Sequence, residues 1–218
     1  MNFNKNNFRI DKDVAYFLGV LHSDGCIYFF NNKKENRKQI RLNLTIGKKS
    51  IPMALKFQRI LSTHFNRTVN LRKVPNKEAY VIQTSINRLW YLFKNWKDQN
   101  IPREIKDSYR LFGVYLAGLI DGDGFVQIKN NTQDRIIPQC VIKIGSDRPL
   151  KVVRTLIKNY FGCKPHFEYA KKSNTVETCF YISKKNFDLV ETFVLPHIVM
   201  PYKAERINKF LKMKKTGL

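Results

Sequence analysis

Hydrophobic and polar positions repeat in the same order twice along the 218-residue chain. In each copy an apolar stretch with helical spacing runs into an acid followed by glycine, first in residues 14–25 and again in residues 109–124. Segments that alternate between apolar and polar residues follow, as in residues 39–46, where Ile and Leu occupy every second position. The pattern predicts two copies of a unit with the order α-β-β-α-β-β-α.

The boundaries of these elements follow from the period of the pattern and from turn residues. Asp11 or Asp13 is expected to cap the first helix, and Ser108 the matching helix of the second copy. We predict helices over about 14–23, 50–65, 87–97, 108–120, 149–161, 184–195 and 201–214, and hairpins over about 26–46, 68–85, 125–144 and 164–183.

The repeat predicts two similar halves of an α+β protein, related by a pseudo-twofold axis. We place the N-terminal half at residues 1–100, a linker at residues 101–107 and the C-terminal half at residues 108–218. Pro102 marks the linker, because proline interrupts whatever helix precedes it.

The repeated apolar stretch ends in an unusual way. Residues 116–124 read LAGLIDGDG, so two acids lie where a helix carries partial negative charge and normally favours Lys or Arg. Gly118 and Gly122 leave one flank nearly bare, so that another backbone could approach closely, and Gly124 is suited to a left-handed residue that ends the helix. Residues 17–25, FLGVLHSDG, have the same form.

The small residues of the two stretches predict that their helices pack together. Gly19 and Ser23 would then face the two glycines of the second copy, and Asp24 and Asp123, which are 99 residues apart, would meet at one end of the contact. Two adjacent carboxylates repel one another unless a cation lies between them, and oxygen ligands suit Mg²⁺. This arrangement predicts a metal site.

The two stretches resemble the motif of the LAGLIDADG homing endonucleases, specifically their single-chain members, which carry two copies. The second copy is the better match, since the first has His22 where the family has an acid. The resemblance implies a saddle of antiparallel sheets, with the two motif helices packed at the central interface. It also implies a monomer that binds double-stranded DNA and has no membrane association.

The implied activity is site-specific cleavage of both DNA strands at a long asymmetric site. One phosphodiester in each strand would be hydrolysed across the minor groove, leaving staggered 3′ overhangs. Asp24 and Asp123 would bind Mg²⁺, and the carbonyls of Ser23 and Gly122 would also face the metal. Mn²⁺ is expected to substitute, and Ca²⁺ to support binding without cleavage.

The family also places polar residues beside the scissile phosphates. Lys203, near the start of the last helix, matches the lysine that polarises water or stabilises the transition state. Its first-half counterpart is open between Arg103 and Lys106. Lys48, after the second strand, is a further catalytic candidate, with Ser146 as its approximate counterpart.

Charge and hairpin composition favour a nucleic-acid partner. The chain has 40 Lys and Arg against 17 Asp and Glu, a formal charge of +23. A two-stranded ribbon fits the major groove, where Arg and Lys read guanine and Asn and Gln read adenine, although polar residues alternate on any solvated sheet. The predicted DNA contacts are Arg37, Lys38, Arg41, Asn43, Arg72, Lys73, Lys129, Asn131, Gln133, Arg135, Gln139, Lys143, Lys171 and Lys172.

Two alternatives share the scaffold. One is an intron-encoded maturase that binds its own intron RNA, and the other is a DNA-binding protein that does not cleave; neither requires a metal site.

No apolar run is long enough to span a membrane and the polar start lacks a secretory segment. We therefore expect a soluble intracellular protein, in a mitochondrion, a chloroplast or the cytoplasm of a prokaryote.

The four cysteines have no zinc-type spacing, and Cys163 and His166 form a lone C-x-x-H pair that we interpret as structural.

Overall fold

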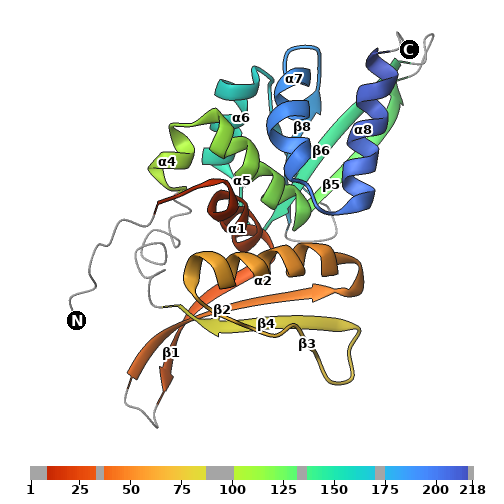
Figure 1. Cartoon of the computed structure of the whole chain (residues 1–218). Coiled ribbons are helices and arrows are strands. Elements are labelled where there is room, and N and C mark those ends of the chain that lie inside the picture. The colour runs from red at the N-terminus through yellow and green to blue at the C-terminus, as the bar shows by residue number, and fades with distance from the viewer. Residues whose placement is uncertain (1–8, 33–36, 87–100, 132–136, 170–174, 216–218) are drawn as a thin grey trace.

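The computed structural model describes residues 9–32, 37–86, 101–131, 137–169 and 175–215. Two four-stranded antiparallel sheets lie on either side of a central pair of helices, α1 and α5 (Figure 1). The expected α+β architecture with motif helices at the centre is confirmed.

The first half contains the elements α1 (Lys12–Ser23), β1 (Gly25–Asn32), β2 (Arg37–Gly47), a 3-10 turn (Lys48–Ser50), α2 (Ile51–Phe65), β3 (Arg72–Lys73) and β4 (Ala79–Ser85). The second begins after α4 (Arg103–Lys106) and contains α5 (Tyr109–Asp121), β5 (Gly124–Asn131), β6 (Ile137–Ser146), α6 (Lys151–Phe161), β7 (His166–Tyr169), β8 (Val176–Ile182), α7 (Phe187–Leu189), a π-helical turn (Val190–Val194), a 3-10 turn (Leu195–His197) and α8 (Pro201–Lys215). Within the described ranges, every helix is too short or too polar to span a bilayer.

The two sheets have the same topology. Sheet A has the strand order β1-β2-β4-β3, and sheet B has the order β5-β6-β8-β7. On each sheet one face is buried under helices: Leu42 and Leu44 of β2 and Ile142 of β6 are fully buried, as the alternating pattern predicts. We call the opposite face of each sheet its outer face.

Two predicted helices need comment. The expected helix over 184–195 is instead a short α7 followed by π-helical and 3-10 turns, and Pro196 within the last turn has no N–H to continue an α-helix. The predicted closing helix of the first half, residues 87–97, lies outside the described residues.

The helix starts follow the predicted capping residues. Asp11, rather than Asp13, caps α1, because its carboxylate accepts a hydrogen bond from the Val14 N–H at 3.0 Å. The Ser108 hydroxyl accepts from the Leu111 N–H at 3.3 Å and caps α5 in the same way.

The prediction that Gly124 is left-handed is wrong, because its φ lies outside that region. Glycine is required there for a different reason. A Cβ atom on Gly124 would lie 2.3 Å from the carbonyl oxygen of Ile120, and one on Gly25 would lie 2.7 Å from that of Leu21. The chain therefore turns back so tightly on the motif helix that no side chain fits at either position.

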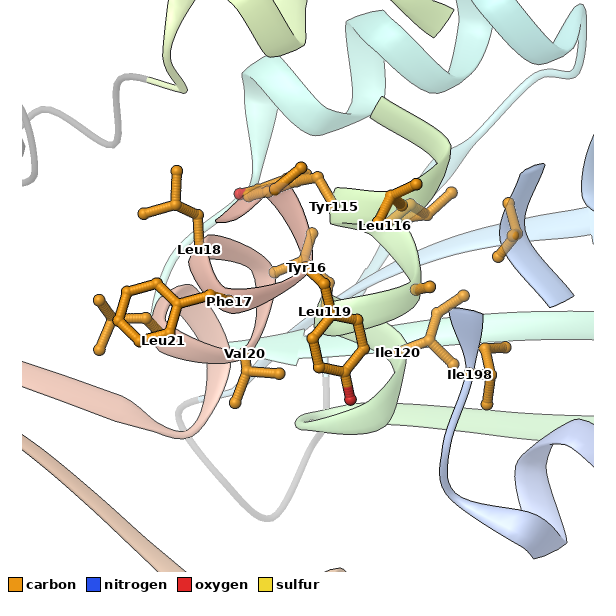
Figure 2. Packing of buried hydrophobic residues seen from close by; sticks show 14 of the residues in the cluster. Tyr16, Phe17, Leu18, Val20, Leu21, Tyr115, Leu116, Leu119, Ile120 and Ile198 are labelled. Atoms are coloured by element: carbon orange, nitrogen blue, oxygen red, sulfur yellow. The ribbon is translucent and has the colours of Figure 1, made fainter. Parts of the chain in front are cut away.

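The two motif helices contact one another through their backbones. A Cβ on Gly19 would lie 2.1 Å from the Tyr115 carbonyl oxygen, and one on Gly118 would lie 2.3 Å from the Tyr16 carbonyl oxygen. Figure 2 shows Tyr16 lying between the ribbons of α1 and α5, with Leu18 on the opposite side of α1. Both helices are buried on nearly every side, as their all-round apolar sequences require.

This backbone contact predicts a large stability loss for a single methyl group. We expect Gly19→Ala to lower the free energy of unfolding by about 3 kcal/mol or more, because neither helix backbone can move away without opening the core. Gly47→Ala is the matched control, since a Cβ there meets nothing within 4 Å. Urea denaturation of both variants tests this; equal stabilities would contradict the close packing.

Candidate functional site

Asp24 and Asp123 come together at the ends of the motif helices. The backbone N–H of Asp24 donates to the Val20 carbonyl at 3.0 Å and ends α1. The carbonyl of Asp123 accepts from the Gly145 N–H at 3.1 Å, which ties this residue to β6. The two carboxyl groups hydrogen-bond to each other, so one acid from each half contributes to a single site.

The electrostatics of the pair favour binding of a cation. Burial, together with the charge of Asp123, raises the pKa of Asp24 to about 6, and Lys203 opposes this rise. Burial also raises the pKa of Asp123 above its ordinary value. Two neighbouring carboxylates are hard oxygen ligands whose mutual repulsion a divalent ion would relieve, so the residues present fit such an ion.

Lys203 is only 2% exposed, and its charge acts on both acids. Its ammonium donates to three carbonyl oxygens at the end of α5, those of Ile120 at 2.7 Å, Asp121 at 2.8 Å and Gly122 at 3.1 Å. A cation at this position offsets the negative end of the helix dipole. Lys203 is therefore a fixed positive charge that acts on both acids.

Asp121 holds the segment that carries Lys203. Its buried carboxylate accepts hydrogen bonds from the Tyr16 hydroxyl at 2.6 Å and from the N–H groups of Val199 at 2.8 Å and Met200 at 3.1 Å. These bonds join α1, the end of α5 and the start of α8. The first-half counterpart of this acid is His22.

His22 of the first half contacts Tyr115 of the second, as Asp121 of the second half contacts Tyr16 of the first. Its Nδ1 hydrogen-bonds to the Tyr115 hydroxyl at 2.5 Å, and Tyr16 and Tyr115 are separated by the same 99 residues as His22 and Asp121. Burial lowers the pKa of His22 to about 3, so the ring is neutral near neutral pH. In the sequence His22 stood out only as a departure from the motif, although the equal spacing was a signal for this pair.

Comparisons with known proteins bear on this arrangement. No family model matches the chain. The uncharacterized protein MJ0314 of Methanocaldococcus jannaschii is 30% identical over 130 residues, which span 58% of this chain and 46% of that protein. The chain therefore matches less than half of the length of this relative.

Solved structures of homing endonucleases superimpose over most of the chain. I-DmoI in complex with DNA and Ca is 19% identical, with a TM-score of 0.62 over 91% of this chain and 97% of its own. The I-LtrWI LAGLIDADG homing endonuclease bound to target DNA is 14% identical, with a TM-score of 0.56 over 96% and 92%. The chain has the LAGLIDADG homing endonuclease fold, in its single-chain form.

In this LAGLIDADG fold, Lys48 and its approximate counterpart Ser146 lie at different positions in the two sheets. Gly25 pairs with Leu44 in sheet A, whereas the matching Gly124 pairs with Ile144 in sheet B. Lys48 lies four residues beyond the first of these partners, but Ser146 lies only two beyond the second. The two are therefore not equivalent in the sheets, and the role of the exposed Lys48 stays a prediction.

Neither first-half candidate for the role of Lys203 lies beside the acids. Arg103 is exposed and pairs with Asp107 at 3.0 Å, and Lys106 ends the same short helix, α4. Figure 1 shows α4 beside the start of α5. The acids lie at the other end of this 13-residue helix, which is about 20 Å long at 1.5 Å per residue. The Pro102 and Pro201 segments match at an interval of 99, which makes Glu104 the positional counterpart of Lys203.

The outer face of sheet A carries three of the predicted DNA contacts. Arg41 and Asn43 lie there on β2, with the guanidinium of Arg41 3.2 Å from the centre of the Phe30 ring. Exposed Arg72 shares this face through its pairing with Val81, whereas the neighbouring Lys73 is on the other face. Among the described residues, the side-chain oxygen of Asn43 has no hydrogen-bond partner.

The outer face of sheet B carries Lys129, Gln139 and Lys143. Lys129 is exposed and pairs with Gln139 across the strands. Lys143 has acidic partners, Glu177 at 2.9 Å and Glu168. Burial by itself would lower the pKa of Lys143, but these hydrogen bonds raise it above its ordinary value. The positive charge of Lys143 therefore has acidic partners within the protein.

The remaining predicted contacts cannot be placed on either face. Gln133, Arg135, Lys171 and Lys172 lie outside the described residues. The backbones of Arg37, Lys38 and Asn131 are in strands next to the hairpin tips, and their side chains lie outside the described part. Their roles stay predictions.

One cluster of metal-binding side chain types lies away from the acids. Potential ligand atoms of His166, Glu168 and Cys179 are within 4.8 Å of one another. The carboxylate already pairs with Lys143, and burial raises the pKa of the Cys179 thiol to about 11, so the cluster is better described as a charge network than as a metal centre. The C-x-x-H partner Cys163 is not part of it.

The half-buried His22 predicts a dependence of stability on pH. Its pKa is about 3 in the folded protein against 6.5 unperturbed, so between these values only the unfolded chain binds the proton. The stability is fully present above pH 6.5 and is lost as the pH falls towards 3, by about 1.4 kcal/mol per pH unit. Denaturation at pH 5 and 7 should show a shallower decline in His22→Asn than in the parent; identical slopes would contradict this assignment.

Lys203→Met should destabilise the LAGLIDADG fold. The change leaves three buried carbonyl oxygens without their donor, so we expect the free energy of unfolding to fall by about 3 kcal/mol. Lys209→Met, at an exposed position of the same helix, is the control and should change little. Thermal denaturation of both provides the measurement, and a stable Lys203→Met protein would show that the ammonium is dispensable for folding.

Proposed function

We propose that the chain is a monomeric, site-specific endonuclease that cuts double-stranded DNA. The observation that carries the proposal is the pairing of Asp24 and Asp123, one acid from each half, at one end of the helix interface. Support also comes from proteins of the same fold: I-DmoI has been seen with DNA and Mn and with its target DNA in the presence of Mg, and I-SmaMI with an uncleaved DNA target and calcium.

The DNA would lie along the outer faces of the two sheets. These faces carry exposed Arg, Lys and Gln side chains, and the formal charge of +23 attracts the phosphate backbone. Antiparallel ribbons of this width enter the major groove, where such side chains reach base edges. Because the two faces carry different residues, the proposed target is long and asymmetric. Cleavage across the minor groove would leave staggered 3′ overhangs.

Asp24 and Asp123 would hold Mg²⁺, with the carbonyls of Ser23 and Gly122 as further proposed ligands. We expect Mn²⁺ to substitute, and Ca²⁺ to allow binding without cleavage. The bound ion would supply an activated water and would offset the charge that develops on the phosphate.

The surrounding residues of the chain position and charge this site. The ammonium of Lys203, fixed by three carbonyl oxygens, places a positive charge next to the acids and so favours an incoming phosphate. Asp121 keeps Lys203 in place through the start of α8. Lys48 is a further catalytic candidate of the first half.

The paired acids favour cleavage over the two alternatives. Bringing two partly buried carboxylates into contact destabilises the folded protein, because burial and mutual repulsion both disfavour their charged forms. An RNA-binding maturase or a DNA-binding protein that does not cleave gains nothing from this contact. A cation-dependent nuclease requires it.

Replacing either acid should separate cleavage from binding. We expect Asp24→Asn and Asp123→Asn each to abolish strand scission in Mg²⁺, while the affinity for target DNA changes less than about threefold, since the sheets provide the affinity. Asp107→Asn, at the exposed C-terminal end of α4, removes the same charge and should cut normally.

The assay uses a randomised duplex library incubated with each protein in Mg²⁺ and in Ca²⁺, followed by sequencing of the cut ends. Recovery of one long site cut by the parent in Mg²⁺ alone is the expected result. If the parent cuts no duplex but binds structured intron RNA tightly, the maturase replaces the nuclease as the function.

A further inference from the structure

The outer faces of the two sheets differ in charge. Among the described residues, the outer face of sheet A carries no carboxylate, and Arg41 and Arg72 give it positive charge. The outer face of sheet B contains two glutamates, Glu168 on β7 and Glu177 on β8. In a chain with only 17 acids against 40 basic residues, two acids on this face require an explanation.

The glutamates are direct cross-strand partners in an antiparallel pair. Like charges in this position repel one another and weaken the pairing. Lys143, on the adjacent strand β6, relieves the repulsion because its ammonium lies between them, 2.9 Å from a carboxylate oxygen of Glu177 and in contact with Glu168. His166 adds a further hydrogen bond to Glu168 at 3.0 Å.

The network points its acceptors outward. The side chain of Lys143 is 15% exposed, whereas those of Glu168 and Glu177 are 39% and 33% exposed. The lysine side chain is therefore the least exposed of the three. Each carboxylate offers about four acceptor sites, and the contacts with Lys143 and His166 use only some of them. Both carboxylates are partly exposed on the outer face of sheet B, so further hydrogen-bond donors can reach them.

A DNA phosphate could not approach this part of the face without repulsion from both carboxylates. A base edge could approach it, provided that it presents hydrogen-bond donors. In the major groove, the exocyclic amino group of cytosine is the donor that Glu and Asp side chains accept from. The charge of the network therefore selects for a base edge rather than for the backbone.

We infer that Glu168 and Glu177 form a specificity site for cytosine in one half of the DNA target, with Lys143 as their internal counterion. The inference rests on the proposed DNA-binding function and names residues that read bases within it. The sequence alone places Lys143 among the DNA contacts. In this inference it is instead the counterion of the two acids.

The test is selection of bound sequences from a randomised duplex library in Ca²⁺, where binding is read without cleavage. The parent should select cytosine at one or two neighbouring positions of one half-site. Glu177→Gln and Glu168→Gln should each reduce that preference about tenfold and leave the other positions unchanged. Glu205→Gln, at an exposed position on α8, removes the same charge and should leave the whole profile as in the parent.

A fourth variant separates the role of Lys143 from direct reading. Lys143→Met leaves the carboxylates without their counterion, so affinity should fall for all sequences while the base preference stays the same. Loss of a guanine preference in this variant would mean that Lys143 reads the base itself, and would overturn the inference. Thermal denaturation of each variant, run alongside, shows that the protein is folded.

The remaining outcomes are distinguishable. If the parent selects a defined site, and both glutamine variants select the same bases, the inference is wrong and the proposed function stands. If the parent selects no duplex at all, the proposed function fails, and the inference fails with it.

Discussion

The contact between the backbones of α1 and α5 is the constraint on which the rest of the structure depends. Gly19 and Gly118 allow each helix to touch a carbonyl oxygen of the other, at a distance that no side chain would permit. This contact aligns the two halves about a common axis, so both sheets turn their outer faces away from the helices. It also brings the ends of both helices to the same point.

That arrangement creates an electrostatic problem, because both helices end in acids. The second half solves it with two buried groups. Lys203 supplies a positive charge to three carbonyl oxygens at the end of α5, and Asp121 fixes the segment that carries this lysine. In the first half, His22 takes the place of the acid and remains neutral. The two halves share a fold but differ in chemistry at the centre, where one has Asp121 and the other His22. Their sheets also differ, because only the outer face of sheet B carries glutamates among the described residues.

Much of the fold could be predicted from periodicity alone. Helix and strand depend on the local spacing of apolar residues, so the repeated pattern in the sequence gives two sheets with the same topology. Asp11 and Ser108 cap their helices through their side-chain oxygens. The small residues in the motif helices also predicted their packing. Predictions that depended on a single local signal did less well: Gly124 is constrained by contact with its own helix rather than by a left-handed φ, and helix 184–195 is broken into irregular turns.

The sequence by itself therefore determined the two halves, the helix interface and the identity of the acids that meet there, because these depend on periodicity and on residue size. Only the tertiary structure decided how the charged side chains are used. Lys203, one of 40 basic residues, donates to three carbonyl oxygens at the end of α5, and Lys143 lies between two glutamates from different strands. Such pairings join residues far apart in the chain, and their geometry depends on strand register and burial, which no local pattern encodes.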